Sequence, residues 1–175
     1  IASRFGAETP FIRPTDLATD EVSVYLAITH CLKWLEENED YCPDYLMLLQ
    51  PTSPLRNQGD ITNAVGLSIK EDADGVVSLC RAKPHPYWSK RVAESGQLSD
   101  FISQQSPNYH RQSLPDAYAV NGAIYLAKPQ LLLEKQTFYS DRTYAYIMPE
   151  ERSVDIDTEL DWKFVEFITG KPSLT

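Results

Sequence analysis

The apolar run at residues 45–49 (Tyr-Leu-Met-Leu-Leu), followed directly by the polar turn Gln-Pro-Thr-Ser-Pro, constrains the fold most strongly. A short run that is apolar at every position is typical of a strand covered on both faces, as in a parallel sheet. Other strand patterns alternate with patterns of helical spacing, which predicts an α/β fold with a mostly parallel sheet and flanking helices. The other predicted strands lie at residues 10–14, 75–80, 118–126 and 144–147.

The predicted helices place apolar residues at helical spacing, so each has one face that can be buried. The first helix is expected to begin near Thr19 or Asp20. Its buried face is predicted to contain Tyr25, Ile28, Leu32 and Leu35. A second helix is expected to be capped by Asp60, and a third to pass through residues 131–133. The last helix is predicted at about 159–169, with an apolar face of Leu160, Phe164, Phe167 and Ile168.

The overall composition limits the classes of function. A length of 175 residues suits one domain, and we expect residues 1–175 to form it. The formal net charge of −9 argues against general binding of nucleic acid. No apolar run approaches the roughly 20 residues of a membrane-spanning helix, so no membrane partner is expected. Three cysteines without a C-x-x-C pair predict neither a disulfide framework nor a zinc site, which favours a cytoplasmic location.

The stretch at about 83–113 differs in character from the rest of the chain. It is rich in Pro, Ser, Gln and His and contains only short apolar pieces. This composition predicts a strand-and-loop excursion from the main sheet, which is a common place for a lid or for a contact between two copies of a chain.

The first candidate site is the sequence L-L-Q-P-T-S-P-L-R at 48–56. In open α/β sheets, ligands bind just beyond the C-terminal ends of the strands. Gln50 can both donate and accept hydrogen bonds, Thr52 and Ser53 offer hydroxyls, and Arg56 can pair with a carboxylate or a phosphate. The same residues are also compatible with an ordinary strand-to-helix turn, and both interpretations remain open.

The second candidate is D-I-D-T-E-L-D at 155–161. If residues 154–157 are extended, Asp155 and Asp157 point to the same face. Two carboxylates at one place repel unless a cation neutralises them, and Mg²⁺ commonly uses one or two carboxylates together with substrate phosphates. Thr158 and Asp161 instead resemble a helix capping box. We therefore expect Asp155 and Asp157 to bind Mg²⁺ and Asp161 to be structural.

The third candidate consists of Arg111 in a polar loop and the dipeptide Asn121-Gly122. Asn-Gly is the strongest short signal of a hairpin turn, so Asn121 can have a purely structural role. Arg111 can equally be a solvated surface charge. Residue type alone does not identify either of them as part of a site.

Together these motifs resemble the CMP-sialic acid synthetases, which are cytidylyltransferases acting on sialic acid and related nine-carbon sugar acids. The resemblance covers nearly the whole chain. Its motifs are G-A through F at 6–11, R-P at 13–14, L-A-x-D at 17–20, the run at 48–56, R-Q-x-L-P at 111–115, N-G-A-I-Y at 121–125 and the acids at 155–161.

The resemblance implies a fold, a reaction and partners. The fold is a Rossmann-like sheet of the nucleotide-diphospho-sugar transferase type, and the partner is a second copy of the chain, bound through the excursion at 83–113. In the implied reaction, the anomeric hydroxyl of a nonulosonic sugar acid attacks the α-phosphate of CTP and releases pyrophosphate. Mg²⁺ offsets the charge of the phosphates as they separate.

The resemblance also implies roles for individual residues. Asp155 and Asp157 resemble the catalytic acids that bind the metal. Arg111 resembles an arginine offered across the dimer, and Arg13 falls at a nucleotide-side position. The residues that resemble contacts to the sugar acid are Gln50, Asn121, Tyr125, Phe138 and Tyr139.

The chain departs from the family pattern at its start. Family members open with a strand and a loop of the form A-R-x-x-S-K-G that cradles CTP, and a second strand ends in an S-T-D-like turn. Residues 1–175 contain neither sequence. We therefore expect these N-terminal strands to be missing and the 175-residue chain to bind CTP poorly and to be impaired or inactive.

Two alternatives remain open at this point. The chain could be a sibling transferase for legionaminic, pseudaminic or 3-deoxy-octulosonic acid, and the wording L-Q-P-T-S-P-L-R favours the sialic or legionaminic branch. It could also be a truncated, non-catalytic relative that acts as a dimeric binding module.

Overall fold

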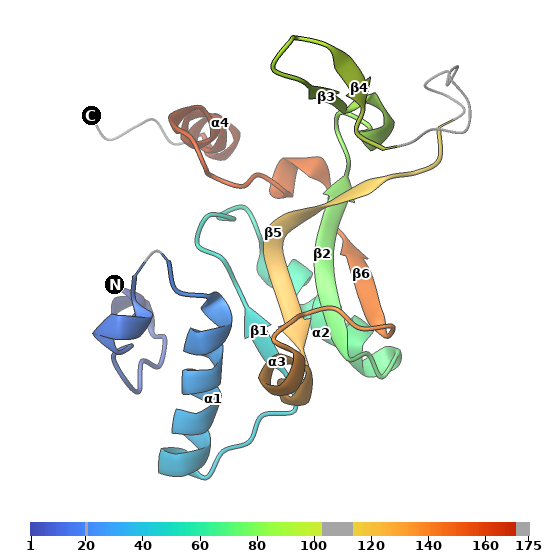
Figure 1. Ribbon diagram of the computed structural model, residues 1–175. Coiled ribbons are helices and arrows are strands. Elements are labelled where there is room, and N and C mark those ends of the chain that lie inside the picture. The colour runs from blue at the N-terminus through green and yellow to red at the C-terminus, as the bar shows by residue number, and fades with distance from the viewer. Residues whose placement is uncertain (20, 103–113, 171–175) are drawn as a thin grey trace.

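The computed structural model describes residues 1–19, 21–102 and 114–170, and its centre is a four-stranded sheet (Figure 1). The strand order is β1-β5-β2-β6. The strands span Leu46–Leu48 (β1), Gly75–Arg81 (β2), Tyr118–Ala127 (β5) and Thr143–Ile147 (β6). All four were predicted from the sequence. Residues 10–14 form a loop and not the predicted strand, because the prolines at both ends lack an N–H for a ladder.

The sheet is mixed and not mostly parallel as expected. β2 and β6 pair in parallel, whereas β5 pairs antiparallel with both β1 and β2. β1, β2 and β6 therefore point in the same direction and only β5 is reversed. The reversal follows from the connection, because the chain returns beside the same strand after the excursion that follows β2, and the described residues of that excursion contain no crossover α-helix. The predicted α/β class with flanking helices is confirmed.

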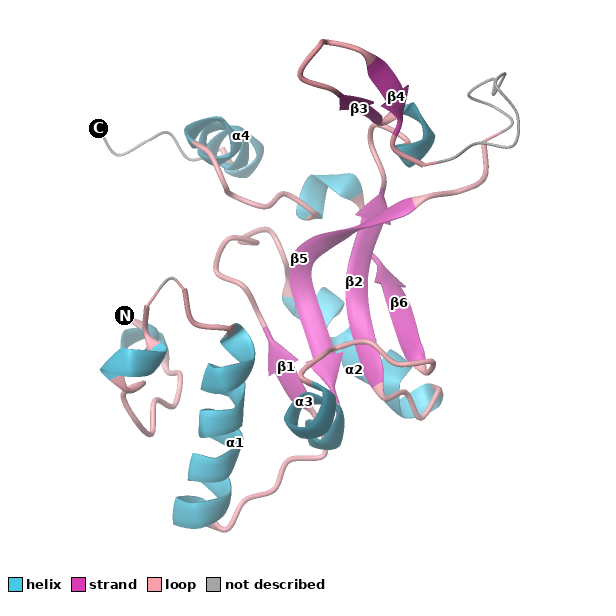
Figure 2. Ribbon diagram, in the orientation of Figure 1, coloured by secondary structure: helices cyan, strands magenta, loops and turns pink. Residues whose placement is uncertain are grey.

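Helices cover both faces of the sheet (Figure 2). The helices span Val24–Glu39 (α1), Gln58–Lys70 (α2), Pro129–Lys135 (α3) and Glu159–Thr169 (α4). On one face, α1 and α3 pack against the sheet in a core cluster that includes Ile28, Leu32, Val77 and Leu132. On the other face, α2 packs in a second cluster that includes Ala64, Val76, Ile124 and Met148.

The N-caps of the helices agree only in part with the predicted ones. The Oγ of Ser23 accepts the N–H of Tyr25, so the N-cap of α1 lies three to four residues after the predicted position, in a segment with several residues that could act as caps. In α2, Asn57 is the N-cap and Asp60 is the reciprocal partner in a capping box, so Asp60 is not the cap itself. The predicted capping box of Thr158 and Asp161 is confirmed at α4.

The prediction for the apolar face of α4 is wrong. Among the residues of this helix only Val165 is buried, whereas Phe167 is 82% exposed and the other three predicted residues are also exposed. The reason is the position of the helix, because α4 stands apart from the central sheet (Figure 1).

The excursion after β2 forms a separate small sheet above the main one (Figure 2). Its strands, Lys90–Val92 (β3) and Leu98–Asp100 (β4), pair antiparallel. Residues 103–113 of the excursion lie outside the described residues. Short 3-10 helices span Ala2–Phe5, Thr15–Leu17, Pro86–Trp88 and Glu150–Arg152. None of the described helices has the length and apolar character needed to cross a membrane.

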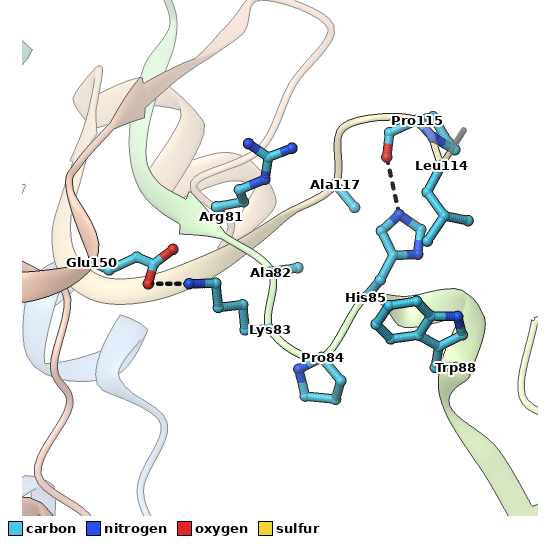
Figure 3. Close-up of a pocket in the computed structure, with 10 residues that line it drawn as sticks. All are labelled: Arg81, Ala82, Lys83, Pro84, His85, Trp88, Leu114, Pro115, Ala117 and Glu150. Atoms are coloured by element: carbon cyan, nitrogen blue, oxygen red, sulfur yellow. Dashed lines mark hydrogen bonds and ion pairs between the residues drawn. The ribbon is translucent and has the colours of Figure 1, made fainter. Parts of the chain in front are cut away.

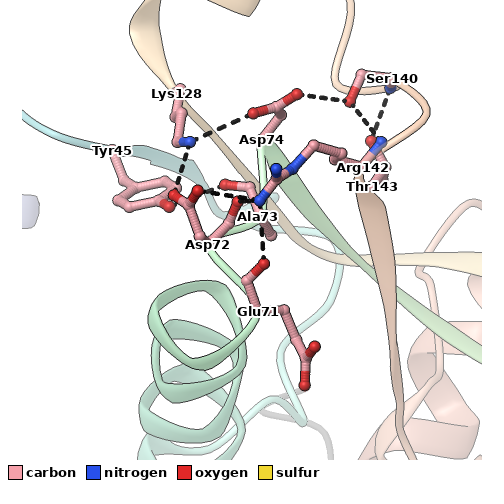
Figure 4. A network of polar contacts seen from close by, with 9 residues as sticks. All are labelled: Tyr45, Glu71, Asp72, Ala73, Asp74, Lys128, Ser140, Arg142 and Thr143. Carbon is pink, nitrogen blue, oxygen red and sulfur yellow. Dashed lines mark hydrogen bonds and ion pairs between the residues drawn. The ribbon is translucent and has the colours of Figure 1, made fainter.

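One end of the sheet is closed by ion pairs (Figure 4). The ammonium of Lys128, at the end of β5, contacts Asp72 at 3.1 Å and Asp74 at 3.3 Å. Arg142, just before β6, contacts Asp72 at 3.0 Å. The Oγ of Ser140 donates to Asp74 at 3.2 Å. These contacts join the starts of β2 and β6, so the opposite end of the sheet, where β1 and β2 finish, is available for a ligand site.

Candidate functional site

A wide bulge in β5 defines the candidate site. Val77 pairs with Tyr125 and Leu79 pairs with Val120, so Ser78 alone faces residues 121–124 of β5. Gly122 lies inside the bulge with a φ of 75°, a left-handed conformation that glycine adopts without strain. The hairpin interpretation of Asn-Gly is therefore wrong, because the dipeptide lies within a strand, although the left-handed backbone that it indicates is present.

Three oxygen atoms gather over the bare Cα of Gly122. A Cβ placed there would lie 2.7 Å from Oε1 of Gln50, 3.1 Å from Oδ2 of Asp155 and 3.3 Å from Oγ of Ser53. Only a residue without a side chain permits this approach. The bulge therefore brings Gln50 and Asp155, two of the residues predicted from separate motifs, to one place.

The turn after β1 is bonded directly to the bulge. One terminal N–H of Arg56 donates to the carbonyl of Ala123 at 2.6 Å and to that of Gln50 at 3.3 Å. Burial lowers the pKa of Arg56, and the charge of Asp60 opposes that effect. Ser53 is fully buried, and its Oγ donates to the carbonyl of Asn121 at 3.5 Å. Arg56 therefore anchors the turn instead of pairing with an anion, whereas Gln50 remains beside Gly122.

The acidic segment lies against the same turn. The N–H of Ile156 donates to the carbonyl of Thr52 at 2.8 Å, although residues 153–157 are a loop and not the extended strand expected from the sequence. Oδ1 of Asp155 is buried and has no hydrogen-bond partner among the described residues. Asp157 is exposed, and its backbone N–H donates to the carboxylate of Asp161 at 3.2 Å.

The carboxylate of Asp155, with its buried Oδ1, fits the donor set that Mg²⁺ uses, and Asp157, two residues later, carries the same type of donor at an exposed position. A buried carboxylate oxygen without a partner is costly unless a cation or a proton reaches it. Mg²⁺ commonly takes one or two carboxylates and completes its shell with water and phosphate. Within the described ranges, no group of three or more His, Cys, Asp or Glu side chains could hold an ion by itself. A metal at Asp155 and Asp157 would therefore need oxygen atoms from a substrate or from water.

Aromatic side chains form the neighbouring wall. The ring of Phe138 lies 5.3 Å from that of Tyr125 and 5.8 Å from that of Tyr25, measured between centroids. Burial raises the pKa of Tyr125, and the charges of Tyr139 and Asp155 raise it further. Phe138 is buried in the core and Tyr139 is half exposed. Tyr125 therefore lies close to Asp155, and Phe138 packs against Tyr125 from the core.

The remaining predicted residues lie elsewhere. Arg13 lines an apolar groove of about 490 Å³ between α1 and β1, whose lining includes neither Gln50 nor Asp155. Arg111 lies outside the described residues. Asn121 is placed directly under the site, where it is buried.

A second cavity of about 470 Å³ lies beyond the end of β2 (Figure 3). Its charged groups already have partners, since Lys83 contacts Glu150 at 2.6 Å and Arg81 contacts Asp116 at 2.7 Å. His85 bonds to the carbonyl of Pro115 at 3.0 Å. None of the predicted site residues lines this cavity.

Sequence reasoning missed an ion pair that supports the acidic segment. Asp60 is 1% exposed, and its two carboxylate oxygens accept from Nε and a terminal nitrogen of Arg152 at 3.0 and 2.9 Å. Arg152 ends the 3-10 helix three residues before Asp155. No local pattern in the sequence indicates this contact, because 92 positions separate the two residues.

Comparison with known proteins finds relatives among cytidylyltransferases and CMP-sugar-acid synthases. No family model matches the chain. An N-acylneuraminate cytidylyltransferase from Streptococcus agalactiae is 33% identical over 151 residues, which is 86% of this chain. The chain spans only about a third (35%) of the length of that relative.

Two other relatives are matched over most of their own length. The CMP-N,N'-diacetyllegionaminic acid synthase of Legionella pneumophila is 32% identical over 167 residues, 95% of this chain and 71% of that protein. The post-translational flagellin modification protein B of Campylobacter coli is 30% identical over 175 residues, 99% of this chain and 73% of that protein. With this extent of similarity, the chain belongs to the family of N-acylneuraminate cytidylyltransferases and related CMP-nonulosonic acid synthases.

Proposed function

We propose that this chain provides the sugar-acid and metal side of a site that transfers CMP from CTP to a nonulosonic acid and releases pyrophosphate. The observation that carries the proposal is the buried, unpartnered Oδ1 of Asp155, whose other oxygen lies with Gln50 over Gly122. The position in the fold agrees as well, since the site is built from the turn after β1 and the loop after β6, beyond the C-terminal ends of these two strands. The names of the matched relatives supply the reaction class.

Asp155 and Asp157 would hold Mg²⁺ through their carboxylates, and the ion, when bound, supplies charge stabilisation at the phosphates. The other groups bind the sugar acid. The Gln50 amide can bond to its hydroxyl or carboxylate groups, and the exposed side of Tyr139 can pack against its side groups. Tyr125 stays neutral because its pKa is raised, so its hydroxyl can donate to an anionic ligand.

We also propose a homodimer formed through the excursion. Exposed apolar side chains on its described part support this, namely Val92, Leu98 and Phe101. Burying such residues against a second copy would remove apolar surface from water. In such a dimer, Arg111 would reach the site of the other copy, and Arg13 would act on the nucleotide side. The three free cysteines are compatible with a cytoplasmic location.

The residues proposed to bind the sugar acid and Mg²⁺ lie on the turn after β1, on β5 and on the acidic segment, and these should bind the sugar acid together. The test is calorimetric titration of N-acetylneuraminic acid in the presence and absence of Mg²⁺, on a sample whose intact mass matches 19.9 kDa. We expect Mg²⁺-dependent binding that is lost in Asp155→Asn.

A matched control separates the acid from general charge effects. Asp141 is exposed at the opposite end of the sheet, so Asp141→Asn should bind the sugar acid as the wild type does. Equal binding by Asp155→Asn and the wild type would contradict the proposed site.

The second candidate function is a dimeric binding module without catalysis. It predicts sugar-acid binding without any turnover even when CTP is saturating. Competition between N-acetylneuraminic, legionaminic, pseudaminic and 3-deoxy-octulosonic acids would then identify the ligand. We propose the sialic or legionaminic type, because those names recur among the matched relatives.

A further inference from the structure

The side-chain amide of Asn121 has no hydrogen-bonding capacity left for a ligand. Its Oδ1 accepts from Oγ of Ser78 at 2.6 Å and from the N–H of Ala123 at 3.3 Å. Its Nδ2 donates to Oγ of Ser153 at 2.9 Å and to the sulfur of Met148 at 3.4 Å. An asparagine amide offers two donors and two acceptor sites, and all four are occupied here. Only 5% of the residue is exposed.

These bonds connect three segments that would otherwise be independent. Ser78 lies on β2, where its Oγ also accepts the N–H of Ile124 at 2.7 Å and so replaces a backbone partner that the bulge removes. Ser153 lies in the loop after β6, two residues before Asp155, and its Oγ donates to the carbonyl of Pro149 at 2.8 Å. A continuous chain of bonds therefore runs from β2 through Asn121 to the acidic segment.

We propose that Asn121 is a positioning residue, which fixes Ser153 and thereby aims Asp155 at Gln50, and that it makes no contact with the sugar acid. The role of Asp155 as a Mg²⁺ ligand rests on the proposed function. The geometry favours this role because Gly122, the next residue, exposes its backbone to the site while the Asn121 amide is directed into the interior. A buried amide with every bond satisfied also holds one unique arrangement.

The experiment compares amide hydrogen exchange at Ile156, whose N–H bonds to Thr52 and reports on the acidic segment. Removing the hydroxyl in Ser153→Ala should accelerate this exchange about fivefold, which is the factor that corresponds to the net free energy of one buried hydrogen bond. Ser153→Thr keeps the hydroxyl and should restore slow exchange. Ser99→Ala, at an exposed position of β4, is the matched control and should change nothing. The amide of Val76 in the core provides the reference for global unfolding.

A second measurement separates positioning from direct contact. If Asn121 positions Asp155, Ser153→Ala and Asn121→Ser should weaken Mg²⁺-dependent binding of N-acetylneuraminic acid by similar factors, and the double variant should lose no more than either alone. If Asn121 touches the sugar acid, Asn121→Ser weakens binding while Ser153→Ala does not, and the proposal is overturned.

The two measurements keep the two proposals apart. Unchanged exchange at Ile156 in Ser153→Ala, or faster exchange at Val76 to the same extent, would overturn the positioning role whatever the sugar-acid result. If the wild type binds no sugar acid at all, the proposed function fails, while the exchange at Ile156 still decides whether Asn121 holds the acidic segment.

Discussion

Asp60→Asn is expected to destabilise the protein strongly without leaving a cavity, because the two side chains have the same shape. Each carboxylate oxygen of Asp60 accepts two hydrogen bonds. Oδ1 accepts from the hydroxyl of Tyr146 at 3.1 Å and from Arg152, and Oδ2 accepts from the N–H of Asn57 at 3.0 Å and from Arg152. The side chain is 1% exposed, so water cannot replace these donors.

The magnitude follows from this arrangement. Asparagine replaces one acceptor oxygen by an NH₂ group, which would face two N–H or O–H donors whichever way it is turned. Two hydrogen bonds to the charged carboxylate are lost, one of them from Arg152, and each is worth about 1.5 kcal/mol. The expected loss in the free energy of unfolding is therefore about 3 kcal/mol, measured by urea denaturation with linear extrapolation.

The pH dependence gives a sharper test than the magnitude. Burial raises the pKa of Asp60, but the bonds from Arg152, Asn57 and Tyr146 outweigh it and hold the pKa below its ordinary value of 3.8. A lowered folded pKa stabilises the protein above the unfolded value, and the stabilisation is lost as the pH falls through the folded value. Asparagine does not titrate. The gap between wild type and variant should therefore be full at about pH 7 and shrink below about pH 4.

Asp116→Asn is the matched control, because Asp116 pairs with Arg81 on the surface, where both side chains are exposed. Its expected loss is under about 1 kcal/mol. A loss for Asp60→Asn that equals the control, or one that stays constant from neutral to acidic pH, would refute the reasoning that the charge of a buried carboxylate stabilises this structure.

Three further substitutions test other local features by urea denaturation. Gly122→Ala forces a residue with a side chain into the left-handed conformation, which costs about 1 to 2 kcal/mol, and places its Cβ 2.7 Å from Oε1 of Gln50. Gly6→Ala is the control, because Gly6 has a φ of 84° and open space around it, and it should show the backbone cost alone. Equal losses of stability in the two variants would refute the crowding at Gly122. Thr158→Ala removes the cap of α4 and should lose about 1 kcal/mol; no loss would show that the capping box is not formed. Phe167→Ser should change stability by less than about 0.5 kcal/mol because Phe167 is exposed, and a larger loss would mean that its face of α4 is covered in solution.

The strands of the main sheet could be predicted because each is a local pattern. Residues 75–80 and 118–126 show the apolar periodicity of buried strands, and the structure contains both within a few residues. The direction of β5 could not be predicted in the same way. It depends on where the excursion returns, and nothing in the local sequence of a strand states which neighbour it will pair with.

The site was predictable to the extent that its motifs are individually polar and follow buried strands. Gln50 and Asp155 were expected from separate motifs and do meet, because both lie beside the bulge at Gly122. The supports of the site were missed. Ser78 and Ser153 are ordinary serines in sequence, and their role appears only when β2, β5 and the loop after β6 are brought together.

The site is held mainly by hydrogen bonds, whereas the fold is held by two apolar clusters, so substitutions should affect the two differently. The clusters lie on either face of the sheet, and the site lies at the bulge of β5 beside the turn after β1. Truncating Leu132 in a cluster removes apolar burial and should lower stability while the bonds of Asn121 remain. Losing the hydroxyl of Ser153 removes little apolar surface but frees the segment that carries Asp155. Leu132 is not a hydrogen-bond partner of Asn121 or Ser153, so the effects of these two substitutions on stability and on site geometry should be largely independent.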